Sequence, residues 1–206
     1  LSSGDITNVV FHPTDPNVIY VYDNRSSNGN RNYVFRSVDA GTTFNLAGNM
    51  SGNSNTGGGY FSVSADCPDC LYFASDAGVW KSLDQGSSFT FMTNPSEECD
   101  GFAVNDMDTS KMIYGYVDLM ASTNGGQSFD QVTWWALGNS NHGSGNNMEN
   151  FFNTDVYVHA DTRVALSVNG VFYVGTDGWV CKSTDNGSTW EAVSYTHLRA
   201  HETRRY

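Results

Sequence analysis

Short apolar runs alternate with polar, turn-forming segments along the chain, and the runs are four to seven residues long. Runs such as NVIYVYD, CLYFASD and MIYGYVD are rich in Val, Ile, Tyr and Phe, and they are bounded by turn signals such as PTDPN, CPDC and MDTSK. β-Branched and aromatic residues between turn signals are typical of strands, and no segment shows a convincing amphipathic helical period. The pattern predicts an all-β protein.

The same arrangement of runs is repeated four times, and each copy ends in a similar nonapeptide, which we call a box. The four boxes are RSVDAGTTF (36–44), KSLDQGSSF (81–89), ASTNGGQSF (121–129) and KSTDNGSTW (182–190). Their acidic or amide position falls at 39, 84, 124 and 185, so the copies are offset by 45, 40 and 61 residues. Two apolar runs precede each box, a short run leads into it and an aromatic residue begins another run after it.

Each copy therefore predicts four strands, and four strands in about 40–45 residues is the size of a propeller blade. We expect a partial β-propeller of about four blades, each a four-stranded antiparallel sheet. The expected ranges are 5–48, 59–94, 101–133 and 156–193, with a long loop at 134–155.

The box pattern, Ser-x-Asp/Asn-x-Gly-x-Ser/Thr-aromatic, resembles the Asp-box of the BNR-repeat β-propellers. That superfamily includes sortilin-like receptors, xyloglucanase-type glycoside hydrolases, sialidases and non-catalytic assembly factors. The resemblance extends from Asp5 to about Val193. It implies a propeller fold, and because such rings usually have six to eight blades, it also implies that the missing blades of a full-length protein are partners of these four.

The residue types of the boxes point to a structural role at the hairpins. The glycines can adopt the positive φ that a tight hairpin needs, the carboxylates can accept hydrogen bonds from N–H groups of their own turn, and the aromatic residues can fill the space between strands. Four catalytic copies would also need four active sites, whereas a propeller has one central pocket. The residues concerned are Asp39, Gly41, Phe44, Asp84, Gly86, Phe89, Asn124, Gly126, Phe129, Asp185, Gly187 and Trp190.

A second acidic series, at 23, 76, 118 and 177, follows the second run of each copy. Most of its members should be structural for the same reason, but Asp23 is followed by an insertion, NRSSNGNRN. The stretch VVFHPTDPNVIYVYD resembles the opening blade of xyloglucanase-type propellers, where a carboxylate after the second strand can act as catalytic base. The Gly-Gly expected after it is absent, so Asp23 is either a candidate catalytic residue or another structural one.

The third repeat is lengthened by the segment 130–159, which contains Trp134-Trp135, the stretch GNSNHGSGNN and Phe151-Phe152. Aromatic rings beside amide side chains suit a sugar-binding surface, so Trp134 and Trp135 are candidate ligand-binding residues. Alternatively, both belong to the outer strand of the blade.

The stretch YVHADTR follows, and in a strand His159, Asp161 and Arg163 would share one face because side chains alternate. It resembles a His-x-Asp-x-His/Arg stretch found in bacterial BNR-repeat proteins. His159 could act as a general acid or base oriented by Asp161, with Arg163 binding a ligand. A salt-linked structural cluster is the alternative.

Composition excludes several classes of function. The formal net charge is −12 with 10 Lys and Arg, which speaks against nucleic-acid binding, and no apolar run approaches the length of a membrane span. Sialidase chemistry needs three arginines to clamp a carboxylate, together with a Tyr nucleophile and a Glu partner. Outside the last residues only four arginines remain, one of them (Arg36) flanks a box, and no Phe-Arg-Ile-Pro segment occurs. The lone CPDC lacks the second pair that a zinc site would need, so Cys67, Cys70, Cys99 and Cys181 are assigned structural or disulfide roles, with redox or metal chemistry as the alternative. No cofactor or metal is expected.

The last residues, SYTHLRAHETRRY (194–206), show neither strand alternation nor turn signals. They resemble translated sequencing adapter, so we exclude them from the fold, and the start at Leu1 without Met is expected to be a truncation.

Two functions remain. The first is a secreted bacterial propeller domain that binds a polysaccharide or a cell-surface protein and does no chemistry. The second is a glycoside hydrolase of the xyloglucanase type that cleaves β-glucan with paired carboxylates.

Overall fold

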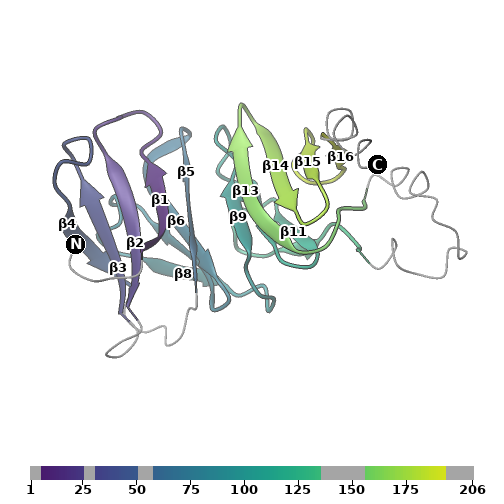
Figure 1. Ribbon diagram of the computed structural model, residues 1–206, viewed down its shortest axis with the longest axis horizontal. Helices are drawn as coiled ribbons and strands as arrows, with labels where there is room; N and C mark the ends of the chain where they lie inside the picture. The colour runs from purple at the N-terminus through teal and green to yellow at the C-terminus, as the bar shows by residue number, and fades with distance from the viewer. Residues whose placement is uncertain (1–5, 26–30, 51–57, 136–155, 194–206) are drawn as a thin grey trace, which may run out of the picture.

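A computed structural model describes residues 6–25, 31–50, 58–135 and 156–193 of the chain. This part contains four separate four-stranded antiparallel sheets and no helix, and it therefore contains no helix that could cross a membrane. The sheets follow one another along the chain (Figure 1), and we number them blades 1 to 4. The predicted all-β, four-blade architecture is confirmed.

Within each blade the strands pair in simple chain order. Blade 1 comprises β1 (Ile6–Phe11), β2 (Ile19–Arg25), β3 (Arg31–Ser37) and β4 (Asn45–Asn49). Blade 2 comprises β5 (Tyr60–Ser64), β6 (Cys67–Ser75), β7 (Gly78–Ser82) and β8 (Thr90–Thr93). Blade 3 comprises β9 (Gly101–Val104), β10 (Met112–Gly115), β11 (Leu119–Ser122) and β12 (Asp130–Gln131). Blade 4 comprises β13 (Thr162–Val168), β14 (Val171–Thr176), β15 (Val180–Ser183) and β16 (Glu191–Ala192).

The first strands of the four blades, β1, β5, β9 and β13, contact one another in succession, so they form the inner side of the series. The fourth strands form the outer side. Each box connects the third strand of a blade to the fourth. We call this end of the blades the box end, and the end that carries the second-to-third strand connections the far end.

Apolar side chains form three cores, and each core lies between two consecutive blades. Strand β6 shows the principle. Leu71 and Phe73 belong to the core against blade 1, whereas Cys70, Tyr72 and Ala74 belong to the core against blade 3. Because side chains alternate along a strand, a strand between two blades is buried on both faces. This explains why its sequence is a continuous apolar run.

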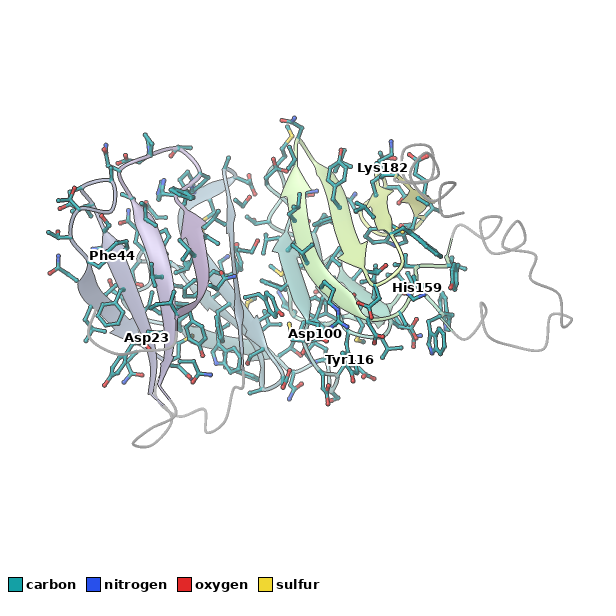
Figure 2. All side chains as sticks on the ribbon, in the orientation of Figure 1. Asp23, Phe44, Asp100, Tyr116, His159 and Lys182 are labelled. Carbon is teal, nitrogen blue, oxygen red and sulfur yellow. A yellow bond between two sulfur atoms is a disulfide. The ribbon has the colours of Figure 1, made fainter. Side chains whose placement is uncertain are left out.

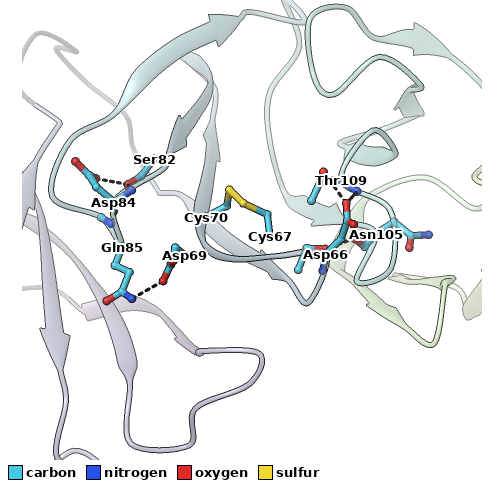
Figure 3. Close-up of a disulfide and its surroundings, with 11 residues drawn as sticks. Asp66, Cys67, Asp69, Cys70, Ser82, Asp84, Gln85, Asn105 and Thr109 are labelled. Carbon is cyan, nitrogen blue, oxygen red and sulfur yellow. Dashed lines mark hydrogen bonds between the residues drawn. A yellow bond between two sulfur atoms is a disulfide. The ribbon is translucent and has the colours of Figure 1, made fainter.

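Two of the four cysteines form a disulfide (Figure 3). Cys67 and Cys70 are joined at the start of β6, close to the turn from β5, and their Cα atoms are 5.3 Å apart. Cys99 and Cys181 are free thiols in the cores. Burial raises the pKa of both, that of Cys181 to about 12, so neither thiol is a nucleophile at neutral pH.

Candidate functional site

The box of blade 2 shows how these turns are closed. The Ser82 hydroxyl donates to Asp84 Oδ1 at 2.7 Å and accepts from the backbone N–H of Gly86 at 2.8 Å. The two oxygens of Asp84 accept from the backbone N–H and the hydroxyl of Ser88, at 2.8 and 2.6 Å. The boxes of blades 1 and 4 repeat these bonds around Asp39 and Asp185.

In blade 3 an amide replaces the carboxylate and one bond changes direction. Asn124 Oδ1 accepts from the backbone N–H of Ser128 at 3.1 Å, while Asn124 Nδ2 donates to the Ser128 hydroxyl at 2.8 Å. The turn is therefore closed without a charge.

Hydrogen bonds hold the box carboxyl groups ionised. Bonds from the side chain and backbone of Thr43 lower the pKa of Asp39 to about 2, and those from Ser88 lower the pKa of Asp84 to about 2. For Asp185, burial raises the pKa, but the bonds from Thr189 and Ser183 outweigh it and the net shift is downward. Such carboxylates are poor proton donors or acceptors near neutral pH.

The box glycines also join the blades to one another. The four have φ between 84° and 90°, where glycine is favoured. A Cβ on Gly187 would lie 2.6 Å from Ile113 Cδ1 of blade 3, and one on Gly86 would lie 3.1 Å from Val34 Cγ1 of blade 1. A Cβ on Gly126 would lie 3.5 Å from Met92 Cε of blade 2. Each of these three boxes is therefore packed against the preceding blade.

At the far end, the acidic residue after each second strand has a different partner. Asp76 accepts from the backbone N–H of Cys99 at 2.8 Å, and Asp118 accepts from that of Trp135 at 2.6 Å. Asp177 accepts two bonds from Arg163, from Nε at 2.7 Å and from Nη2 at 3.0 Å. Asp23 is fully buried on β2, where it is paired with Tyr33 of β3.

The sequence interpretation of YVHADTR as one strand is wrong. Strand β13 begins at Thr162, so His159 and Asp161 precede it, and Asp161 has a φ of 62°. Arg163 alone of the three candidates lies on the strand. The Asp161 carbonyl accepts from the backbone N–H of Asp177 at 3.3 Å, beside the first pair of the ladder, Thr162 with Thr176. The positive φ of Asp161 interrupts the extended conformation directly before this pair.

His159 packs into an aromatic group at the far end of blade 4. Its ring lies edge-on to Trp179 with centroids 5.1 Å apart, and Tyr157 lies 5.9 Å from the same indole. A Cβ on Gly178 would lie 2.7 Å from the His159 ring. The turn between β14 and β15 therefore packs so closely against His159 that there is no room for a side chain at Gly178.

Trp134 and Trp135 lie after β12 and outside it, so they are not part of the outer strand. The backbone N–H of Trp134 donates to the carbonyl of Val156 at 3.2 Å. The Trp134 side chain is 42% exposed, and that of Trp135 is half-buried. The polar stretch after them and Phe151-Phe152 lie outside the described residues.

The interpretation of the sequence missed Asp100, which lies at the far end directly before β9 (Figure 2). Burial raises the pKa of this carboxyl, and the negative charge of Asp76 raises it further, while the positive charge of Arg163 partly offsets both. A signal was available, because an aspartate directly precedes the first strand in three of the four repeats, at 5, 100 and 161.

Figure 2 places Asp100 and Tyr116 near each other, with His159 farther along the series and Asp23 two blades away. The candidates thus share the far end but do not form one cluster. In the described part of the chain, no three His, Cys, Asp or Glu side chains are arranged to hold a metal ion.

No family model matches the sequence, and no curated protein does. Solved propeller structures resemble the fold at low sequence identity. The GH74 enzyme of Niastella koreensis is 18% identical with a TM-score of 0.59, over 93% of this chain and 25% of that protein. YCF48 from Cyanidioschyzon merolae is 14% identical with a TM-score of 0.59, over 95% of this chain and 59% of that protein. U3-55K is 11% identical with a TM-score of 0.61, over 92% of this chain and 52% of that protein.

These likenesses establish the propeller fold. The chain spans between a quarter and about three fifths of the length of these three proteins. One of them is an enzyme by name and the others are not, so the fold is compatible with chemistry and with binding alone.

Proposed function

We propose that this chain is part of an extracellular propeller that binds a glycan through the far end of blades 3 and 4 and does no chemistry. The observation that carries the proposal is the exposed indole of Trp134, whose backbone and that of the next residue are anchored by hydrogen bonds to Val156 and Asp118. A pyranose ring presents an apolar C–H face that stacks on such an indole, and an anchored backbone lowers the ordering cost of binding.

Polar groups suited to sugar hydroxyls lie at the same end of the blades. The exposed ion pair of Arg163 and Asp177 offers donors and acceptors, and Asp118 holds the backbone of Trp135. We therefore assign ligand binding to Trp134, Trp135 and Arg163. A cell-surface protein is the alternative ligand for the same surface.

Calorimetric titration with soluble β-glucan oligosaccharides tests this proposal. Trp134→Ala should weaken binding about tenfold or more, which corresponds to roughly 1.4 kcal/mol. Phe91→Ala is the matched control, because Phe91 is an exposed aromatic residue on β8 of blade 2. Equal losses in both variants, or no binding of any glucan by the unaltered chain, would contradict a glycan ligand at this surface.

A second candidate function is glycoside hydrolysis. It is favoured by two far-end carboxyl groups whose pKa values are displaced in opposite directions. Burial raises the pKa of Asp100, whereas hydrogen bonds from Arg163 lower that of Asp177. Glycosidases use one protonated and one ionised carboxyl group.

Release of reducing ends from β-glucan distinguishes the two functions. A hydrolase should lose about a hundredfold or more of its rate in Asp100→Asn, and Asp23→Asn tests the catalytic base suggested by the sequence. The box variant Asp84→Asn is the control, since its carboxylate binds only within its own turn. If the unaltered chain binds glucan but releases no reducing ends, the binding function is supported and the hydrolase function is not.

A further inference from the structure

The turn between the first and second strands of a blade lies at the box end, and blade 2 closes this turn differently from blades 1 and 3. In each of these three blades, the residue after the box acid or amide donates its backbone N–H to a carbonyl of the turn, at 2.9, 3.0 and 2.9 Å. The accepting carbonyls belong to Asn17, Asp69 and Ser110. These residues therefore occupy equivalent positions, and the three turns can be compared residue by residue as DPNV (15–18), CPDC (67–70) and DTSK (108–111).

An aspartate closes the turn in blades 1 and 3. Asp15 Oδ1 accepts from the backbone N–H of Asn17 at 2.9 Å, and Asp108 Oδ1 accepts from that of Ser110 at 2.9 Å. The carbonyls of the two aspartates also accept from the backbone N–H three residues later, at 3.1 and 3.0 Å. Such bonds from an aspartate to the backbone two residues on are a common means of holding a turn.

In blade 2 a disulfide takes the place of this aspartate. Cys67 stands where the other turns have the aspartate, Cys70 stands three positions later, and the two are joined. A covalent bond therefore replaces the carboxylate as the closure of the turn. Because the ring spans a sequence separation of 3, it restricts the unfolded chain little, so we place its effect in the turn itself.

The turn is linked to the blades on both sides of it (Figure 3). Asp69 Oδ1 accepts from Gln85 Nε2 in the box at 2.6 Å, and Gln85 Oε1 accepts from Arg36 Nη1 of blade 1 at 3.0 Å. Asp66 Oδ2 accepts from the backbone N–H and the hydroxyl of Thr109 in blade 3, both at 3.0 Å. A change in the closure of this turn therefore affects its links to both neighbouring blades.

The two cysteines of the disulfide differ in exposure. Cys67 is half-buried, whereas Cys70 has no exposed surface and belongs to the core between blades 2 and 3. Thiol–disulfide exchange depends on access to the sulfur that is attacked. Cys67 is therefore the half of the disulfide that an external thiolate can reach.

We propose that Cys67 is a site of thiol–disulfide exchange, at which a dithiol reductant opens the turn of the folded protein. One thiolate of the reductant attacks Cys67 Sγ, and the disulfide breaks as Cys70 Sγ leaves with the electron pair and takes a proton. The second thiolate of the reductant then attacks the reductant's own sulfur in the mixed disulfide, and Cys67 leaves and is protonated in turn. Two electrons pass to the protein, and the dithiol becomes a disulfide.

The reduced turn lacks both kinds of closure that the other forms possess. The sulfur of a thiol is a weak hydrogen-bond acceptor, so reduced Cys67 holds the turn less firmly than the disulfide or the carboxylate of Asp15. The carbonyl of Asp69 should then separate more often from the N–H of Gln85 in the box. This redox response lies at the box end and does not depend on the glycan binding proposed for the far end.

Amide hydrogen exchange of the full chain, followed by NMR with and without dithiothreitol, tests the proposal. Reduction should speed exchange of the Gln85 N–H about tenfold or more, because local opening sets this rate. The N–H groups of Ala40 and Gly125 donate to the equivalent carbonyls of blades 1 and 3, and their exchange should be unchanged. They are the internal controls.

Two double variants separate the redox response from the loss of a side chain. Cys67→Asp with Cys70→Val reproduces blade 1, where Asp15 and Val18 hold these positions, so dithiothreitol should not alter exchange at Gln85. Cys67→Ala with Cys70→Val differs from it only in lacking the carboxylate. Its Gln85 N–H should exchange as fast as in the reduced chain, with or without dithiothreitol.

Chemical labelling shows whether the exchange takes place in the folded protein. Iodoacetamide added after dithiothreitol should label Cys67 and leave the buried thiols of Cys99 and Cys181 unlabelled. A disulfide that is reduced only after unfolding, or a Gln85 N–H that exchanges equally slowly in the reduced chain, would overturn the proposal. Equal acceleration at all three box N–H groups would also overturn it, because the chain would then be unfolding globally.

Discussion

The box end and the far end of a blade use similar polar residues with different partners. In blade 2, Ser82 and Asp84 at the box end bind residues of their own turn, whereas Asp76 at the far end binds the backbone of Cys99, on the way to blade 3. The box bonds recur in the other blades, but Asp118 and Asp177 each bind something else. The box residues keep the same partners in every blade because they close a turn. The far-end aspartates have a different partner in each blade, which is typical of loops that can acquire function.

The largest expected effect distinguishes the stability of the box turn itself from that of its contact with the preceding blade. Gly187→Ala should destabilise the chain by about 3 kcal/mol, because it combines strain at positive φ with a clash against the buried Ile113. Gly41→Ala has the same strain but no neighbouring blade, and it should cost roughly 1–2 kcal/mol. Urea unfolding of both variants measures the difference, and equal losses would mean that the box does not contribute to the junction.

A smaller difference is expected between two buried serines of blade 2, one at each end. Ser82→Ala leaves the buried N–H of Gly86 without its acceptor and should cost about 2 kcal/mol. Ser75→Ala removes one bond of 3.3 Å from the N–H of Ala77 and should cost less than about 1 kcal/mol. Thermal unfolding of the two variants measures both losses of stability. A larger loss in Ser75→Ala than in Ser82→Ala would contradict this comparison.

The response of stability to pH should have opposite sign for Asp84 at the box end and Asp118 at the far end. The pKa of Asp84 is lowered from 3.8 to about 2, so its stabilisation is complete above pH 4 and is lost as pH falls towards 2. Burial raises the pKa of Asp118, so its contribution is greatest below its usual pKa and is lost as pH rises through the raised value.

Asp84→Asn, which copies the arrangement of Asn124, should therefore flatten the loss of stability between pH 4 and 2. The change should be below about 1 kcal/mol, because the carboxylate is solvent-screened. Asp118→Asn should leave that interval unchanged and flatten the curve above pH 4. Free energies of unfolding from urea titrations at several pH values test both signs, and parallel curves for the two variants would refute the assignment.

The smallest effect on stability is expected at the far-end ion pair. Arg163 and Asp177 are both largely exposed, and such pairs contribute little to folding. Arg163→Gln should leave the urea midpoint unchanged while weakening the glycan binding proposed above. A large shift of the midpoint would make Arg163 a structural residue and remove it from the binding surface.

The repeat made the fold predictable from the sequence. The apolar runs predicted the strands because a strand between two blades is buried on both faces. The boxes predicted the hairpins because a glycine at positive φ and a hydrogen-bonded serine are required within the turn itself. Strand β12 was harder, since only Asp130 and Gln131 pair there.

The far end was less predictable, because its contacts are made once and over long separations. Asp118 binds the backbone of Trp135, 17 residues later, and no local pattern encodes that bond. Alternation in YVHADTR suggested a strand through all seven residues, whereas the positive φ of Asp161 delays the start of β13 to Thr162. The aspartate before the first strand recurs in three repeats, but that pattern does not encode burial, and the raised pKa of Asp100 arises from burial that only the folded blades create.

The packing of the box glycine Gly86 against Val34 of blade 1 bears on how such a protein can lengthen during evolution. Each blade brings its own fastening for the blade before it and an acceptor surface for the blade after it. A duplicated or inserted copy therefore arrives with both of its attachments. Gene duplication can change the number of blades in one event, while the loops at the far end diverge independently in each new copy.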